Sequence, residues 1–243
     1  MPNLITFGFR CTTDSCLSAF NLRNFSGPFS YLICDFETAI DLIKTDFKNY
    51  FTNIINIGNT DAKIKYLPHW RQTNPFYVNT YYTKENITNV HYYIKNILLW
   101  NHHDMMNTET IETFNRRTKR ILQYLKNEDC ILFYIDRVFE FENLDDYIDN
   151  IKSIIKSNYY FNHKIIYVIP FSSTKYIDFD TKLYYEDNIL NIWLLKTTPM
   201  KELENQTKKQ NKQGTPLLDT DIQDKSINWS VLMNRLKAHY SLK

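Results

Sequence analysis

A cysteine near the start of the chain has the position of a catalytic nucleophile. Cys11 follows a short apolar run, Leu4 to Phe9, which predicts a strand. The next residues, Thr12 to Asp14, are suited to cap a helix. A thiol in such a turn would lie at the carboxyl edge of a sheet, where helix amides favour the thiolate. The alternative interpretation is that Cys11 is a small buried apolar residue.

A thiol nucleophile needs a base, and two adjacent histidines are the candidates. His102 and His103 are followed by Asp104, whose carboxylate could orient an imidazole, as could that of Asp136. Consecutive side chains point apart, so only one of the two histidines can face Cys11, and the sequence leaves the choice open. A metal site at this motif is not expected, because consecutive ligands diverge and no second cluster of ligands completes a shell.

Three arginines follow the histidines on a predicted helix. Arg116 and Arg120 are four residues apart and therefore share one helix face, with Arg117 beside them. They are candidates for binding an anionic group of a substrate. The alternative is a solvated face that pairs with acidic neighbours.

The remaining cysteines and the charge balance narrow the class of protein. Cys16, Cys34 and Cys130 lie in or beside predicted helices and a core strand, and their spacing is not that of a zinc site. The 29 basic and 27 acidic side chains are interspersed and give a net charge of +2, so nucleic-acid binding is not expected. The sequence shows neither a membrane span nor a signal-like segment, so we expect a cytoplasmic protein without a membrane partner.

The elements that would position these residues alternate between strands and helices. Strands are predicted from apolar runs at 130–135, 164–169 and 189–195, and the loop-rich segment 52–83 contains a short strand at Phe76 to Tyr82. Helical periodicity occurs at 36–50, 87–98, 111–125 and 144–155. This alternation predicts an α/β fold with a mostly parallel central sheet and helices on both faces.

The sequence also predicts the core and the domain organisation. We expect one α/β domain at residues 1–200, followed at 201–243 by a polar linker and a C-terminal helix that docks on the domain. The linker, Lys201 to Gln213, lacks apolar anchors and is expected to be mobile. The residues expected to be buried in the sheet are Ile5, Phe7, Leu132, Phe133, Ile166, Val168, Ile192 and Leu194.

Several short motifs occur in a recognisable order. They are Phe7-Gly8-Phe9-Arg10-Cys11, Gly27-Pro28-Phe29-Ser30-Tyr31-Leu32, Asp46-Phe47, His102-His103-Asp104, Arg116-Arg117-x-x-Arg120 and Ile131-Leu132-Phe133. From about Leu4 to Arg137 this order resembles a family described as putative papain-like cysteine peptidases, which occurs in bacteria and large DNA viruses. Family members carry Asp and Trp where this chain has Ser30 and Tyr31.

The resemblance implies a cysteine-nucleophile enzyme that forms an acyl-enzyme at Cys11, with His102 or His103 as the base and Ser30 at a substrate-binding position. The substrate would be a small molecule, a peptide or a glycan. The layout is also similar, more loosely, to capsule-polysaccharide acetyltransferase-like enzymes, which use coenzyme A, so acyl transfer in glycan modification is an alternative to hydrolysis. A catalytically inactive binding module of the same fold is a further alternative. The oligomeric state is not indicated.

Overall fold

The computed structural model describes residues 3–8, 11–30, 32–56, 77–83, 97–100, 103–136, 144–159, 161–171, 181–197 and 229–242. In chain order the elements are β1 (Asn3–Thr6), α1 (Cys11–Ala19), β2 (Leu32–Cys34), α2 (Phe36–Lys44), β3 (Ile54–Asn56), β4 (Tyr77–Asn79), β5 (Leu98–Trp100), α3 (Thr108–Asn127), β6 (Cys130–Ile135), α4 (Leu144–Asn158), β7 (Lys164–Phe171), β8 (Thr181–Glu186), β9 (Leu190–Lys196) and α7 (Trp229–Tyr240).

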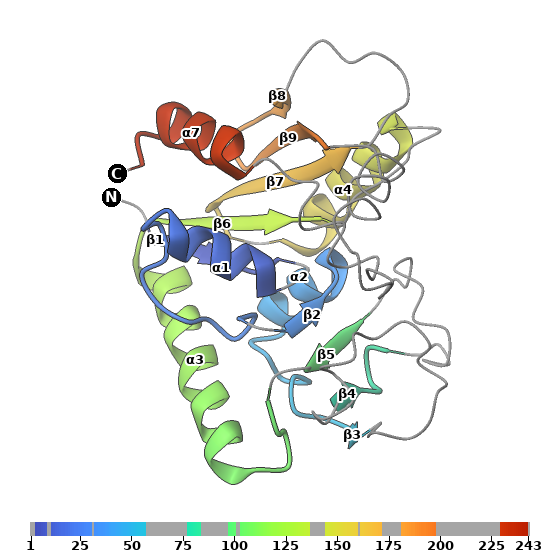
Figure 1. Cartoon of the computed structure of the whole chain (residues 1–243). Coiled ribbons are helices and arrows are strands. Elements are labelled where there is room, and N and C mark those ends of the chain that lie inside the picture. Colours follow the sequence, from blue (N-terminus) through green and yellow to red (C-terminus); the bar gives the residue numbers. More distant parts are fainter. Residues whose placement is uncertain are drawn as a thin grey trace, which may run out of the picture.

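The central sheet has five strands in the order β1-β6-β7-β9-β8 (Figure 1). Strands β1, β6, β7 and β9 pair in parallel, and β8 closes one edge as an antiparallel strand. The apolar runs of β6, β7 and β9 suit strands that are covered on both faces. The predicted α/β fold with a mostly parallel sheet is therefore confirmed.

Helices cover both faces of this sheet. On one face α1 and α7 pack against Ile131, Phe133 and Ile166 in a single apolar cluster. On the other face α2, α3 and α4 pack against alternate residues of the same strands, such as Leu132 and Ile165. The eight residues that the sequence predicted to be buried are all at most 4% exposed: Ile5, Phe7, Leu132, Phe133, Ile166, Val168, Ile192 and Leu194.

A second, antiparallel sheet of four short strands in the order β2-β5-β4-β3 extends the core on the α2 and α3 side (Figure 1). Its register pairs Leu32 with Trp100 and Tyr77 with Trp100. The helical pattern predicted at 87–98 is wrong at its end, because Leu98 begins β5. The rest of that pattern, up to residue 96, lies outside the described residues.

Helix α2 is shorter than its apolar periodicity predicted. It ends at Lys44, and the hydroxyl of Thr45 donates to the carbonyl oxygen of Asp41 at 2.8 Å. Asp46 and Phe47 then adopt positive φ angles of 51° and 60°, which an α-helix cannot contain. The side chains of Phe47 and Tyr50 are nevertheless buried, so the turns that follow α2 supply the apolar positions that suggested a longer helix.

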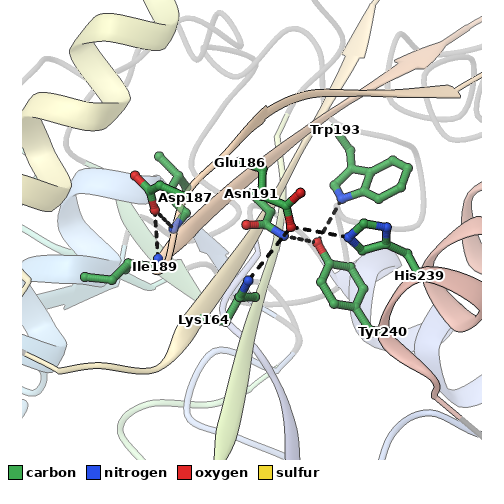
Figure 2. A network of polar contacts seen from close by, with 9 residues as sticks. Lys164, Glu186, Asp187, Ile189, Asn191, Trp193, His239 and Tyr240 are labelled. Carbon is green, nitrogen blue, oxygen red and sulfur yellow. Dashed lines mark hydrogen bonds and ion pairs between the residues drawn. The ribbon is translucent and has the colours of Figure 1, made fainter.

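Helix α7 is fastened to the central sheet by a polar network at the amino-terminal ends of β7 and β9 (Figure 2). The Tyr240 hydroxyl accepts hydrogen bonds from Asn191 Nδ2 at 2.6 Å and from Trp193 Nε1 at 3.0 Å. The carboxylate of Glu186 accepts from Asn191 at 3.0 Å and lies 3.4 Å from His239 Nε2. The apolar side chains of α7 are buried against the same face of the sheet as α1.

Two expectations fall on the segment 198–228, which lies outside the described residues: the mobility of Lys201 to Gln213, and the polar linker between the domain and the final helix. Among the helices that the structure describes, none has both the length and the apolar character needed to cross a membrane.

Candidate active site

Cys11 is the first residue of helix α1, which follows strand β1. Thr12 to Asp14 therefore lie inside the helix and do not precede it as cap residues. The helix approaches the end of β1 closely at Gly8, where an added Cβ would lie 2.6 Å from the Thr13 hydroxyl oxygen. Because β1 is parallel to its neighbour β6, the turn that carries Cys11 lies at the carboxyl edge of the sheet, as the sequence predicted.

Asp14 fixes the amino-terminal turn of α1. Its side chain is 2% exposed, and its Oδ1 accepts a hydrogen bond from the Thr6 hydroxyl at 2.6 Å. The same oxygen lies 3.4 Å from Nε of Arg23, which is 13% exposed. This carboxylate thus connects β1, α1 and the loop after α1, three residues beyond Cys11. This role was not predicted from the sequence, in which Asp14 had the character of a helix-capping residue.

His103 lies between β5 and α3, so a strand precedes the histidine motif at the place where the helical pattern predicted for 87–98 would end. Its half-buried imidazole packs edge-on against the ring of Phe114, with the ring centroids 4.9 Å apart. The guanidinium carbon of Arg117 lies 4.8 Å from the centroid of the same ring. Phe114 therefore brings a histidine and an arginine together. His102 lies outside the described residues.

The two carboxylates proposed as orienting groups have different surroundings. Asp104 is exposed and accepts hydrogen bonds from the Tyr77 hydroxyl and, at 2.9 Å, from the amide of Met106. The Tyr77 hydrogen bond lowers the pKa of Asp104, which favours its ionised form. Asp104 thereby holds the loop next to His103 against β4.

Asp136 follows β6 at the carboxyl edge of the central sheet and is 8% exposed. Its carboxylate accepts hydrogen bonds from the hydroxyls of Tyr147 and Tyr167. Those two tyrosines come from α4 and β7. Asp136 is thus held in a tyrosine cluster, one strand away from the turn that carries Cys11.

The three arginines predicted to bind an anion differ in how exposed they are to solvent. Arg116 and Arg120 are exposed: Arg116 donates to the Thr113 hydroxyl at 2.8 Å, and Arg120 donates to the carbonyl of Ser26 at 2.9 Å. Arg117 is half-buried, and its terminal nitrogen Nη1 is buried without a hydrogen-bond partner in the described part of the chain. Arg117 is therefore the arginine of this motif that faces inward.

Ser30 has a local structural role that the sequence did not suggest. Its side chain is fully buried, and its hydroxyl oxygen accepts a hydrogen bond from the amide of Gly27 at 2.8 Å. The neighbouring Pro28 carbonyl accepts from the Tyr50 hydroxyl. These contacts hold the loop between α1 and β2 against the core beside α3.

The other cysteines are buried thiols. Burial raises the pKa of Cys16 to about 12 and that of Cys130 to about 11, and it raises the pKa of Cys34 well above its ordinary value. Thiols of this kind remain protonated near neutral pH and react slowly. Among the described residues, no group of histidine, cysteine and acidic side chains is arranged to hold a metal ion.

A family model described as putative papain-like cysteine peptidase matches residues 3–169, which is more than half of the chain. The chain belongs to this family. The matched segment runs from β1 into β7 and contains Cys11, His103 and Arg117, whereas β8, β9 and α7 lie beyond it. No curated protein and no solved structure matches the chain.

Proposed function

We propose that this protein is an enzyme that forms an acyl-enzyme at Cys11, with His103 as the general base. Two separate arrangements in the structure support the proposal. Helix α1 begins at Cys11 directly after β1, while the His103 ring and the Arg117 guanidinium contact the same phenylalanine ring. Burial lowers the pKa of Arg117, while the negative charge of Asp14, on the first turn of α1, raises it and so favours the charged form. Membership of the peptidase family supports the same assignment.

The reaction would proceed in two steps. In the first, the Cys11 thiol transfers its proton to His103, and the sulfur attacks the carbonyl carbon of the acyl donor. A sulfur–carbon bond forms, and the leaving group departs with the proton returned by His103. In the second step an acceptor attacks the thioester carbon and gives its proton to His103. The sulfur–carbon bond breaks, and the departing thiolate takes the proton back from His103. The amides at the start of α1 would stabilise the negative charge that develops in each step.

Asp104 is a positioning residue in this proposal. It is held by Tyr77 and by the Met106 amide, and this fixes the loop that carries the imidazole. Asp136 would contribute a buried negative charge at the same edge of the sheet.

The acceptor decides the type of enzyme. Water would make the protein a hydrolase, and a hydroxyl of a glycan would make it an acyltransferase with a donor such as an acyl-coenzyme A. The first step is common to both, so a single trapping experiment tests them together. A binding module without catalytic activity is the rival, and it would form no acyl-enzyme.

Trapping the acyl-enzyme tests the proposed function. The protein would be incubated with p-nitrophenyl acetate or with acetyl-coenzyme A, and the acetylated residue identified by intact mass and peptide mapping. We expect one acetyl group on Cys11 and its loss on longer incubation, because the thioester is an intermediate.

Cys130→Ala should acetylate like the parent protein, whereas Cys11→Ala should not acetylate but should keep a melting temperature within a few degrees of the parent. Equal acetylation of the parent and of Cys11→Ala would contradict the assignment and would favour the binding-module alternative.

A further inference from the structure

Beside Asp14, on the first turn of α1, positively charged side chains from two parts of the chain come together. Arg117 reaches inward from α3, and Arg23 lies in the loop after α1, where its Nη2 donates to the Ser26 hydroxyl at 2.6 Å. Arg120, one turn after Arg117, donates to the carbonyl of the same Ser26. The loop between α1 and β2 therefore brings the arginines of α3 next to Arg23.

The charges in this region do not balance. Burial lowers the pKa of Arg117 most, and the positive charges of Arg23 and Arg120 also lower it, while the negative charge of Asp14 raises it. The Oδ1 of Asp14 is already engaged by Thr6 and Arg23. Asp14 Oδ2 is buried without a hydrogen-bond partner in the described residues and would by itself repel an anion. The sum of the charges nevertheless stays positive.

Arg117 has the least satisfied charge. Burial lowers its pKa, yet a guanidinium keeps its proton at any physiological pH. Its Nη1 is shielded from solvent and lacks an acceptor within the described ranges. A buried donor on a charged group costs free energy until an acceptor reaches it, and a planar guanidinium is suited to the paired oxygens of a carboxylate or a phosphate. The face of Phe114 holds the guanidinium in place for such a partner.

We propose that Arg117, supported by Arg23, binds an anionic oxygen group, a carboxylate or a phosphate, on the molecule that donates its acyl group to Cys11. This inference rests on the proposed function, because it assumes that the donor binds beside Cys11. It makes the preferred donor a negatively charged compound. Arg116 and Arg120 are exposed to solvent, so an anion gains less from their screened charges than from the buried Nη1 of Arg117.

Two alkylating reagents of similar size test the inference. Iodoacetate carries a carboxylate and iodoacetamide is neutral, so the ratio of their rates at Cys11 reports an anion-binding group next to the thiol. We expect Arg117→Met to lower this ratio by about tenfold or more, because a hydrogen bond to a charged group contributes on that scale. Arg116→Met, on the adjacent exposed position, should keep the parental ratio. Arg117→Lys should give an intermediate ratio, because the charge stays and the planar fork is lost.

The outcomes separate this inference from the proposed function. One outcome is that Cys11 still reacts rapidly with iodoacetamide, while both Arg117 variants keep the parental ratio of iodoacetate to iodoacetamide rates. This outcome would overturn the anion site and leave the nucleophile in place. A slow iodoacetamide rate in the parent protein would contradict the proposed function. In that case anion binding is measured without the thiol, as the shift in melting temperature caused by inorganic phosphate or by acetate.

The parental protein should be stabilised by one of these anions and Arg117→Met should not. The effective anion identifies the group as phosphate or carboxylate, and equal shifts in the two proteins would overturn the inference.

Discussion

Gly8 is the residue whose missing side chain allows helix α1 to approach strand β1. A Cβ at this position would lie 2.6 Å from Oγ1 and 3.1 Å from Cβ and Cγ2 of Thr13. Thr13 is itself buried, so it cannot move aside freely. We expect Gly8→Ala to lower the free energy of unfolding by about 1–3 kcal/mol, as overpacking of a close contact does, and to slow alkylation of Cys11 by displacing the start of α1.

Gly27→Ala is the matched control for Gly8→Ala. Its added Cβ would lie 3.1 Å from the terminal methyl of Ile121, a longer distance than the 2.6 Å at Gly8, and at ordinary contact distance of 3.8 Å from the Thr6 carbonyl oxygen. The free energy of unfolding, measured by chemical denaturation, should fall less for Gly27→Ala than for Gly8→Ala. Equal losses, with unchanged Cys11 alkylation in both, would mean that the contact between Gly8 and Thr13 does not position the nucleophile.

At the residue scale, the types of Cys11 and Arg117 and their order along the chain indicated them as candidate site residues. It could not indicate Asp14 or the difference between Arg117 and its neighbours. A buried pair such as Asp14 and Arg23 depends on how a loop folds back, and no local pattern encodes that return. Likewise, Phe114 looked like one apolar position of a helix, and only the packing shows that its ring contacts both His103 and Arg117.

The attachment of α7 depends on the hydroxyl of Tyr240. Tyr240→Phe would leave one N–H of Asn191 and the indole N–H of Trp193 without their acceptor, and both side chains are at most 5% exposed. We expect a loss of about 1–3 kcal/mol in unfolding free energy, the usual cost of unsatisfied buried donors. Amide exchange should become faster in α7.

Tyr184→Phe is the control for Tyr240→Phe, since it removes an exposed hydrogen bond to Asp145 and should cost less than about 0.5 kcal/mol. Cys11 alkylation should be unchanged in both variants, because the Tyr240 network lies at the amino-terminal ends of the parallel strands. Slower Cys11 alkylation in Tyr240→Phe alone would show that α7 helps to position the nucleophile.

At the scale of elements, the sequence predicted the long helices, the central strands and, within Phe76 to Tyr82, the short strand β4, but it missed the other three strands of the second sheet. Helix α3 and strands β6, β7 and β9 have long, regular apolar patterns that a single periodicity describes. The strands β2, β3 and β5 have only three residues each, which is too short for a period to be recognised. Their pairing is long-range, so it follows from the packed core and not from local preference.

At the scale of the whole molecule, the family match and the fold divide the chain at different places. The match ends at residue 169, within β7, yet β9 pairs with β7 along seven residue pairs and completes the central sheet. Strand β8 and helix α7 then close the edge and one face of that sheet. The segments beyond the match are therefore part of the same core: β9 and β8 form the edge of the sheet away from β1, and α7 covers the face that α1 also covers.

The pH dependence of cysteine alkylation tests the pairing of Cys11 with His103 most directly. Burial raises the pKa of Cys16 to about 12, of Cys130 to about 11 and of Cys34 well above its ordinary value. A group with a raised pKa keeps its proton until the pH approaches that pKa, so these thiols should not react near neutral pH. Iodoacetamide labelling, followed by peptide mass spectrometry, should therefore report Cys11 alone.

We predict that Cys11 in the parent protein is alkylated rapidly down to about pH 6, well below the pKa of about 8.5 of a free cysteine. In His103→Ala the profile should move to higher pH and the rate should fall, whereas His102→Ala should keep the parental profile. The pairing would be contradicted if the alkylation rate of the parent protein depended on pH as that of a free thiol does. It would also be contradicted if neither histidine variant changed the parental profile. In either case Cys11 would have a structural role.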